Sequence, residues 1–228
     1  MGKMKKKPDI IVMLSQNDIT VKDAHNIFMS SWDLDVQNWG FKNTGIDKED
    51  IYKLVKTMKE KGKKTFLEVL TYDEISCLDI AKTAAECEFD EVMGTLYFPS
   101  VHKYLIDNKI SYKPFIGKVS GIPSILESTY AEILDDAKKL LEKGIAGFDF
   151  LAYRSKEDGE TLTRQFCKAI DAEICVAGSI SSFNHIDVML DIAPSAFTIG
   201  SALFDKRFAS NGTFRENLQA VINYIKTK

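Results

Sequence analysis

Two glycine–serine pairs stand at matching places in the last quarter of the chain. Gly178 and Ser179 lie in "VAGSIS", and Gly200 and Ser201 lie in "TIGSAL"; each pair interrupts an apolar run of strand length. Glycine lets the backbone turn sharply and approach a ligand closely, and the N–H groups at the start of a following helix favour an anion. The two pairs therefore predict a phosphate-binding site. The alternative is that both glycines only relieve crowding in tight turns.

Three charged residues farther upstream have side chains suited to acid–base chemistry. Glu68 lies between Leu67 and Val69 in a strand-like run, so its carboxylate points to the opposite face from theirs. A carboxylate turned into a core is costly unless it is paired, and Lys42 and Lys118 are the candidate partners. Glu68 is then a candidate general base, and Lys118 a candidate general acid or Schiff-base amine. A purely structural ion pair is the alternative.

Further polar side chains follow strand-like runs and are candidate contacts to the rest of a ligand. They are Asn17, Thr95, Tyr97, Tyr153 and Arg154.

The order of elements supplies a scaffold that would bring these residues together. Eight strand-like runs alternate with eight helical patterns along the chain. The strands are expected over residues 9–15, 36–42, 65–71, 91–98, 112–119, 146–153, 173–180 and 196–204. The helices are expected over residues 21–32, 47–62, 73–87, 100–108, 129–144, 159–170, 182–193 and 214–226, with a short extra helical turn from Ser201. This alternation predicts parallel βαβ units.

Eight such units in 228 residues predict a single-domain α/β fold over residues 1–228, a closed (β/α)8 TIM barrel. An open doubly wound sheet is the alternative, but it normally has a glycine-rich loop after its first strand. The segment "MLSQND" at that place contains no glycine. In a TIM barrel the carboxyl ends of the strands form the active-site rim, which is where all the candidate residues would lie.

The second strand carries a further indication of a ligand inside the barrel. Trp39 and Phe41 share one face, which suits packing under helices, whereas Asn38, Gly40 and Lys42 share the other. A polar, partly glycine face leaves core volume unfilled, and we interpret it as room for a ligand.

Composition narrows the classes of partner and cofactor. The net charge of -3 gives no reason to expect a nucleic-acid partner. No apolar run approaches the ~20 residues that span a bilayer, and no secretory leader pattern is visible, so we expect no membrane partner and a cytoplasmic location.

The scattered cysteines are expected as buried small hydrophobic residues: Cys77, Cys87, Cys167 and Cys175. The histidines fall on helical patterns, not at strand ends: His25, His102 and His185. We therefore expect no catalytic metal and no other cofactor.

The chain resembles the ribulose-phosphate-binding (β/α)8 barrels, which include isomerases of histidine biosynthesis, barrels of tryptophan biosynthesis and phosphosugar decarboxylases. The resemblance rests on "VAGSI" and "FTIGSAL", their spacing and the eightfold order, so its specific part covers only the last quarter. It implies a phosphorylated ligand with phosphate contacts at Gly178, Ser179, Gly200 and Ser201. The decarboxylases' Asp-x-Lys-x-x-Asp motif is absent from the third strand, and the sixth strand has no lysine.

These observations favour an enzyme that acts on a sugar phosphate as an isomerase, epimerase or lyase, by acid–base or Schiff-base chemistry. The alternative is a non-catalytic sensor of phosphorylated metabolites, resembling the glycerol-3-phosphate-responsive antiterminator regulators, although the acidic balance counts against RNA binding. A weaker option is phosphoribosyl chemistry on a larger ligand. Room for such a ligand depends on the segment 120–129, which is either a mobile lid or a fixed surface loop. A homodimer is one option for the assembly.

Overall fold

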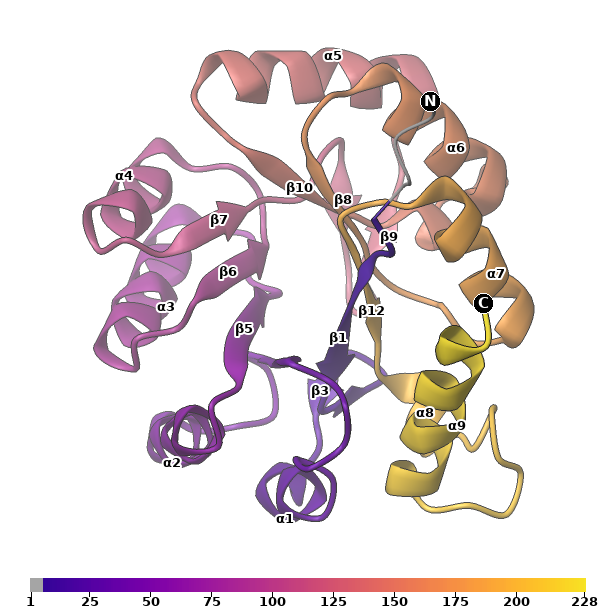
Figure 1. The fold of residues 1–228 in the computed structure, drawn as a ribbon. Coiled ribbons are helices and arrows are strands. Elements are labelled where there is room, and N and C mark those ends of the chain that lie inside the picture. Colours follow the sequence, from indigo (N-terminus) through magenta and orange to yellow (C-terminus); the bar gives the residue numbers. More distant parts are fainter. Residues whose placement is uncertain (1–5) are drawn as a thin grey trace.

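The computed structural model describes residues 6–228 as a barrel of eight parallel strands surrounded by helices (Figure 1). The strand order is β10-β11-β12-β1-β4-β5-β6-β7. A parallel bridge between Phe115 and Asp149 joins the segment after β7 to β10, and the Asp149 N–H donates to the Pro114 carbonyl at 3.0 Å. This bridge closes the sheet, so the predicted barrel is confirmed and the open doubly wound sheet is excluded.

The observed elements follow the expected alternation, with shorter strands. The barrel strands are β1 (Asp9–Met13), β4 (Asn38–Lys42), β5 (Lys64–Val69), β6 (Glu91–Gly94), β7 (Ser111–Lys113), β10 (Gly147–Phe150), β11 (Glu173–Val176) and β12 (Ala196–Ile199). The helices are α1 (Ala24–Met29), α2 (Lys48–Glu60), α3 (Glu74–Glu86), α4 (Pro99–Asp107), α5 (Tyr130–Glu142), η1 (Ala152–Arg154), α6 (Gly159–Ala169), α7 (Phe183–Ile192), α8 (Ser201–Phe204) and α9 (Phe214–Lys226). The extra turn expected from Ser201 is α8.

Local sequence signals set several helix ends. Asp47 caps α2 by accepting the Asp50 N–H at 2.9 Å, and Gly62 follows the helix with a φ of +69°. Thr213 and Glu216 form a reciprocal capping box at the start of α9. Such caps satisfy N–H groups that a helix cannot pair internally, so these boundaries could be expected from the sequence.

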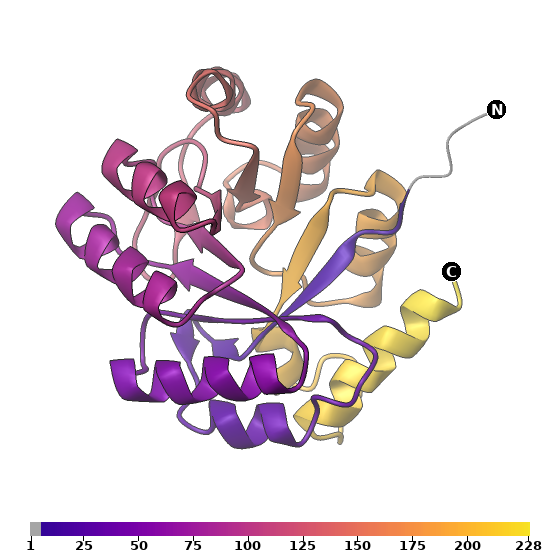
Figure 2. The same cartoon turned by 60° about the vertical axis from the view of Figure 1, so that its left-hand side comes forward.

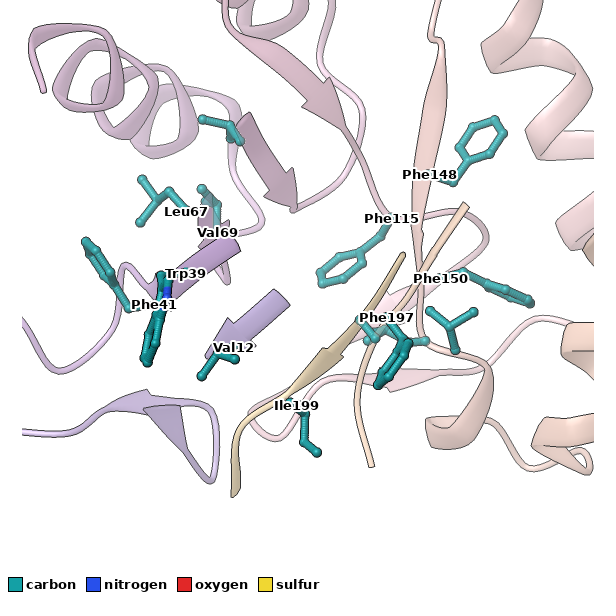
Figure 3. Packing of buried hydrophobic residues seen from close by; sticks show 14 of the residues in the cluster. Val12, Trp39, Phe41, Leu67, Val69, Phe115, Phe148, Phe150, Phe197 and Ile199 are labelled. Atoms are coloured by element: carbon teal, nitrogen blue, oxygen red, sulfur yellow. The ribbon is translucent and has the colours of Figure 1, made fainter. Parts of the chain in front are cut away.

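The largest part of the core lies between the strands and the helices. Trp39 packs edge-to-face on Phe28 of α1 with ring centroids 5.1 Å apart, and Phe41 lies 5.6 Å from Phe89. Figure 3 shows Trp39 and Phe41 on one side of the barrel and Phe148 on the other. All three belong to the cluster of buried side chains between the strands and the helices. The predicted outward face of the second strand is therefore confirmed.

The interior of the barrel is packed by a smaller apolar cluster. Its members are Ile11, Met13, Phe66, Met93, Cys175 and Ala196. A Cβ on Gly40 would lie 2.8 Å from the Met13 sulfur and 2.9 Å from the Phe66 carbonyl oxygen. The interpretation of Gly40 as room for a ligand was therefore wrong, because Met13 and Phe66 already occupy that space.

The fifth strand differs most from its prediction. It was expected over residues 112–119, but β7 ends at Lys113 because Pro114 has no N–H to continue the ladder. Gly117 then adopts a φ of +71° and the chain turns into a hairpin, β8 (Val119–Ser120) and β9 (Ile125–Leu126). A second hairpin, β2 (Ser15–Gln16) and β3 (Ile19–Thr20), follows β1. Neither hairpin was expected from the sequence.

The last helix completes the ring of helices beside the first. Figure 2 shows α9 next to α1 and the segment that follows it. Arg215 at the start of α9 forms an ion pair with Asp33, and Lys226 at its end pairs with Asp35 at 2.7 Å. These contacts join the last helix to the segment after α1 on the outside of the barrel.

Candidate functional site

A cavity of about 630 Å³ opens at the carboxyl ends of the strands. Small-molecule sites usually have volumes of about 300–1,000 Å³. The predicted site residues that line it are Asn17, Lys42, Glu68, Tyr153, Arg154, Gly178, Ser179, Gly200 and Ser201. Most of the residues selected from the sequence thus share one cavity.

Four charged side chains form a chain across the floor of this cavity, and we call them the charged quartet: Glu68, Lys42, Asp18 and Arg154. The Lys42 Nζ lies 2.6 Å from Glu68 Oε1 and 3.1 Å from Asp18 Oδ1. Arg154 donates to both Asp18 oxygens, at 2.5 Å and 2.9 Å. The charges alternate in sign, so the quartet as a whole is neutral. The predicted pairing of Glu68 with Lys42 is present, and Asp18 extends it.

Asp18 is the most heavily bonded member of the charged quartet. It lies in the turn between β2 and β3 with a φ of +64°, and it also accepts the Ser124 N–H at 2.9 Å. Burial by itself would raise the pKa of Asp18. The hydrogen bond from Arg154 and the positive charge of Lys42 outweigh burial, and hold the pKa well below its usual range. Asp18 is therefore an anion that ties the two hairpins together.

The β8–β9 hairpin covers part of the cavity through Ser124. Besides the bond to Asp18, Ser124 makes a hydroxyl–hydroxyl hydrogen bond of 2.7 Å with Tyr72. Arg154 also donates to the Ser124 carbonyl at 3.4 Å. Ser124 is fully buried, whereas Ile122 and Ile125 beside it are exposed. In this structure Ser124 thus holds the segment 120–129 against the charged quartet.

The loops after β11 and β12 form another wall of the cavity. Gly178 and Ser179 both have positive φ, at +77° and +61°. The Asn17 N–H donates to the Ser201 hydroxyl at 3.0 Å, which joins this wall to the β2–β3 hairpin. Two further basic side chains, Lys156 and Arg207, line the same cavity. This wall therefore combines small residues with positive charge.

Both glycines of the Gly-Ser pairs also have steric reasons to be glycine. A Cβ on Gly178 would lie 2.5 Å from Arg154 Nε, because the Arg154 side chain crosses directly over this residue. A Cβ on Gly200 would lie 2.9 Å from the Ser15 carbonyl oxygen. Relief of crowding, the alternative raised from the sequence, thus accounts for these glycines whether or not an anion binds beside them.

The contact between Gly178 and Arg154 can be tested against a matched glycine. Gly62 has a similar φ of +69° but has nothing within 4 Å of the place where a Cβ would be. Gly62→Ala should cost about 1–2 kcal/mol of unfolding free energy through backbone strain alone. Gly178→Ala should cost more, because it also displaces Arg154 from Asp18. Urea denaturation measures both, and equal losses would show that the Arg154 contact is unimportant.

Three predicted site residues lie outside the cavity lining. Lys118 was expected in the lumen beside Glu68, and this was wrong: its side chain is 74% exposed and pairs with Glu127 at 2.6 Å. The reason is the early end of β7, which breaks the alternation from which Lys118 was placed. The lysine that the fifth strand does turn inward is Lys113, which binds Glu91 at 2.7 Å.

Thr95 and Tyr97 are displaced for a similar reason, because β6 ends at Gly94 with a φ of +79°. The buried Thr95 hydroxyl donates to the Thr71 carbonyl. The Tyr97 hydroxyl lies 3.4 Å from His102 Nδ1. Both side chains therefore make contacts within the protein instead of lining the cavity.

Asp18 and Asp149 stand near strand ends in the sequence, but neither was chosen as a catalytic or binding residue. Asp18 lines the cavity. Asp149 lies outside the lining, and its alternation with Phe148 and Phe150 on β10 made its inward direction readable. Ser124, Lys156 and Arg207 reach the cavity from irregular segments, for which periodicity gives no signal.

The histidines and cysteines make packing contacts. His102 is buried between Tyr97 and Tyr112, and burial lowers its pKa. His185 accepts the Ser181 N–H at 3.2 Å through Nδ1 and packs on Tyr153. As predicted, Cys77, Cys87 and Cys175 are buried, and Cys167 is partly buried. Within residues 6–228, no group of three or more His, Cys, Asp or Glu side chains is placed to hold a metal ion.

The sequence predicts no membrane-spanning segment, and the lengths and apolar character of the helices can be compared with this prediction. Across residues 6–228, none of them combines the length and the apolar character needed to cross a bilayer.

The closed parallel sheet, the outer helices and the charged cavity at the carboxyl ends of the strands define a (β/α)8 barrel with a candidate ligand site. Orotidine 5'-phosphate decarboxylase from Pyrococcus horikoshii OT3 has a similar fold, with a TM-score of 0.68, 12% identity and coverage of 95% of this chain and 99% of that chain. A structure described as native KDPGal gives a TM-score of 0.68 at 12% identity, covering 99% and 96%.

A mutant tryptophan synthase alpha-subunit from Pyrococcus furiosus gives a TM-score of 0.67 at 11% identity, covering 96% of this chain and 100% of that chain. No family model matches the chain, and no curated protein matches it. The resemblance to the ribulose-phosphate-binding barrels is thus confirmed at the level of the fold.

Proposed function

We propose that this protein is an enzyme that acts on a small phosphorylated molecule, by proton transfer at a carbon next to a carbonyl group. An isomerase, an epimerase and a carbon–carbon lyase all share this step. The observation that carries the proposal is the common cavity: Glu68 and Lys42 form its floor, while the loops at Gly178 and Gly200 form a wall. A ligand held by its phosphate at that wall would present its carbon chain to the charged quartet.

Glu68 is the proposed general base. Its Oε1 is bonded to Lys42, and its carboxylate would take the proton from the ligand carbon while the electron pair moves to the carbonyl oxygen. The positive groups that would stabilise the resulting enolate are the Lys42 ammonium and the Arg154 guanidinium, which both line the cavity. Lys42 contacts two carboxylates, so we assign it a hydrogen-bonding role in preference to Schiff-base chemistry.

The proposed phosphate grip consists of the backbone around Ser179 and Ser201, with Lys156 and Arg207 supplying positive charge. Residues with small side chains leave the backbone N–H groups accessible to an anion. One of the proteins with a similar fold, orotidine 5'-phosphate decarboxylase, has a phosphorylated compound in its name. This likeness supports the proposal only as an analogy of fold.

Thermal unfolding with a panel of sugar phosphates and the matching unphosphorylated sugars tests the ligand class. A ligand at 100 times its Kd should stabilise the protein by about 2.7 kcal/mol. We expect stabilisation by phosphorylated compounds only. Equal stabilisation by the unphosphorylated sugars would contradict the phosphate grip.

Exchange of ligand C–H for deuterium in heavy water tests the chemistry without knowledge of the product. Wild-type protein should exchange the proton next to the carbonyl of a ligand found in the panel. Glu68→Gln should bind that ligand and lose the exchange, whereas Lys118→Met should behave as wild type because Lys118 is exposed and paired with Glu127. Exchange that persists in Glu68→Gln would refute Glu68 as the base.

A sensor of phosphorylated metabolites is the second candidate function. The observation that favours it is the mutual pairing of the charged quartet, which leaves each cation bonded to a carboxylate within the protein. In that case phosphorylated compounds would stabilise the wild-type protein, but no ligand proton would exchange.

A further inference from the structure

Asp149 is a carboxyl group in the barrel interior that accepts no hydrogen bond from any of residues 6–228. Phe148 and Phe150 pack on Phe166 of α6, so alternation along β10 turns Asp149 into the lumen. Its side chain is fully buried, and neither carboxyl oxygen has a hydrogen-bond partner among residues 6–228. An ionised carboxylate in such a place is among the most costly groups a protein can bury.

The titratable and charged groups around Asp149 come from several elements of the barrel. They are Lys42 on β4, Glu68 on β5, Glu91 on β6, Lys113 on β7, Arg154 of η1 and Cys175 on β11. The cations of this set are already committed to other carboxylates: Lys42 to Glu68 and Asp18, and Lys113 to Glu91 and Glu173. Arg154 is likewise bonded to Asp18. An ionised Asp149 would thus add an uncompensated negative charge.

Burial is the main cause that raises the pKa of Asp149 well above its usual range, and the negative charge of Glu68 raises it further. Lys42 and Lys113 act in the opposite direction without cancelling these effects. Two buried carboxyl groups with unequal contacts therefore share this lumen. Glu68 lines the cavity and is bonded to a lysine, whereas Asp149 lies outside the lining and is bonded to nothing.

We propose that Glu68 and Asp149 form one acid–base unit, in which Asp149 carries a proton in the resting protein and Glu68 is the anion that meets the ligand. The role toward the ligand rests on the function proposed above. Asp149 is a positioning residue, because its neutral form leaves the negative charge on Glu68 and its side chain does not line the cavity.

The unit keeps the proton balance of the proposed reaction simple. Glu68 accepts one proton from the ligand carbon, the electron pair of the broken C–H bond moves to the carbonyl oxygen, and Asp149 stays neutral throughout. If the resting proton were on Glu68 and the charge on Asp149, Glu68 could accept no proton. The bond from Lys42 to Glu68, its place in the cavity lining and the lack of any hydrogen bond to Asp149 thus select Glu68 as the base.

Infrared spectroscopy detects this proton directly, because a protonated carboxyl group absorbs separately from a carboxylate. We expect a protonated-carboxyl band in the ligand-free wild-type protein at neutral pH, and its loss in Asp149→Asn. In Glu68→Gln the band should remain at mildly acidic pH but disappear at a lower pH than in wild type, because the neighbouring negative charge is gone. The control is Asp33→Asn, an exposed surface carboxylate, which should leave the band unchanged.

Two results would overturn the proposal. One is a wild-type protein with no such band at neutral pH, and the other is a band whose pH midpoint is the same in wild type and Glu68→Gln. If Asp149→Asn does not fold, the Glu68→Gln titration still decides the question. The experiment uses no ligand, so its failure is distinguishable from a failure of the sugar-phosphate panel, which tests the proposed function alone.

Discussion

Asp18→Ala is expected to lower the free energy of unfolding by about 3–5 kcal/mol, the range found when one partner of a buried ion pair is removed. The substitution removes the carboxylate that binds Lys42, Arg154 and the Ser124 N–H. Lys42 and Arg154 would then face each other across the cavity floor with no carboxylate between them, because Glu68 is bonded only to Lys42. For a chain of this size, the loss corresponds to a fall in Tm of roughly 10 °C.

Asp33→Ala is the matched control for this prediction. Asp33 also binds an arginine through two hydrogen bonds, to Arg215, but on the surface. Exposed pairs contribute about 1 kcal/mol or less, so the Tm should change little. Thermal and urea unfolding of both variants measure the difference. A similar small effect for both substitutions would mean that the charged quartet is well hydrated and contributes little to stability.

Asp149→Asn is expected to make the protein more stable than wild type, by an amount that grows with pH. The pKa of Asp149 is raised in the folded protein, whereas the unfolded chain releases this proton near pH 4. Between these two pKa values the folded state binds more protons than the unfolded state, so raising the pH favours unfolding. The wild type should lose about 1.4 kcal/mol relative to the variant for each pH unit in this window.

Urea unfolding of wild type and Asp149→Asn at a series of pH values from 4 upward measures this dependence. Taking the difference between the two proteins removes the opposite contribution of Asp18, whose lowered pKa stabilises the fold above acidic pH in both. A stability difference that does not change with pH would show that Asp149 titrates normally in the folded protein.

The barrel was readable from the sequence because most of its strands and outer helices carry their own local signals. The alternation of Trp39 and Phe41 with Lys42, the cap at Asp47 and the buried stripe of α2 are local patterns, and all of them are present in the structure. Eight strand–helix repeats then leave few arrangements other than a barrel.

The candidate site was readable only where it lies on a regular strand. Lys42 and Glu68 were placed correctly because alternation holds to the end of β4 and β5. Lys118 was misplaced because Pro114 ends the ladder, after which alternation has no meaning. The partnership of Asp18 with Arg154 joins residues 136 positions apart, through a hairpin turn and a short 3-10 helix. Periodicity carries no information about a contact of that kind.

The contacts of Asp18 also have a consequence for the order in which the protein assembles. Its bonds to Ser124 and Arg154 span 106 and 136 positions, whereas its partner Lys42 lies on the next barrel strand. Contacts between such distant positions cost more chain entropy than the contact with Lys42, and topologies rich in them fold more slowly. The first strands can therefore pair while the cavity floor is still incomplete. The charged quartet needs Arg154 from the second half of the chain, so we expect the site to be completed late in folding.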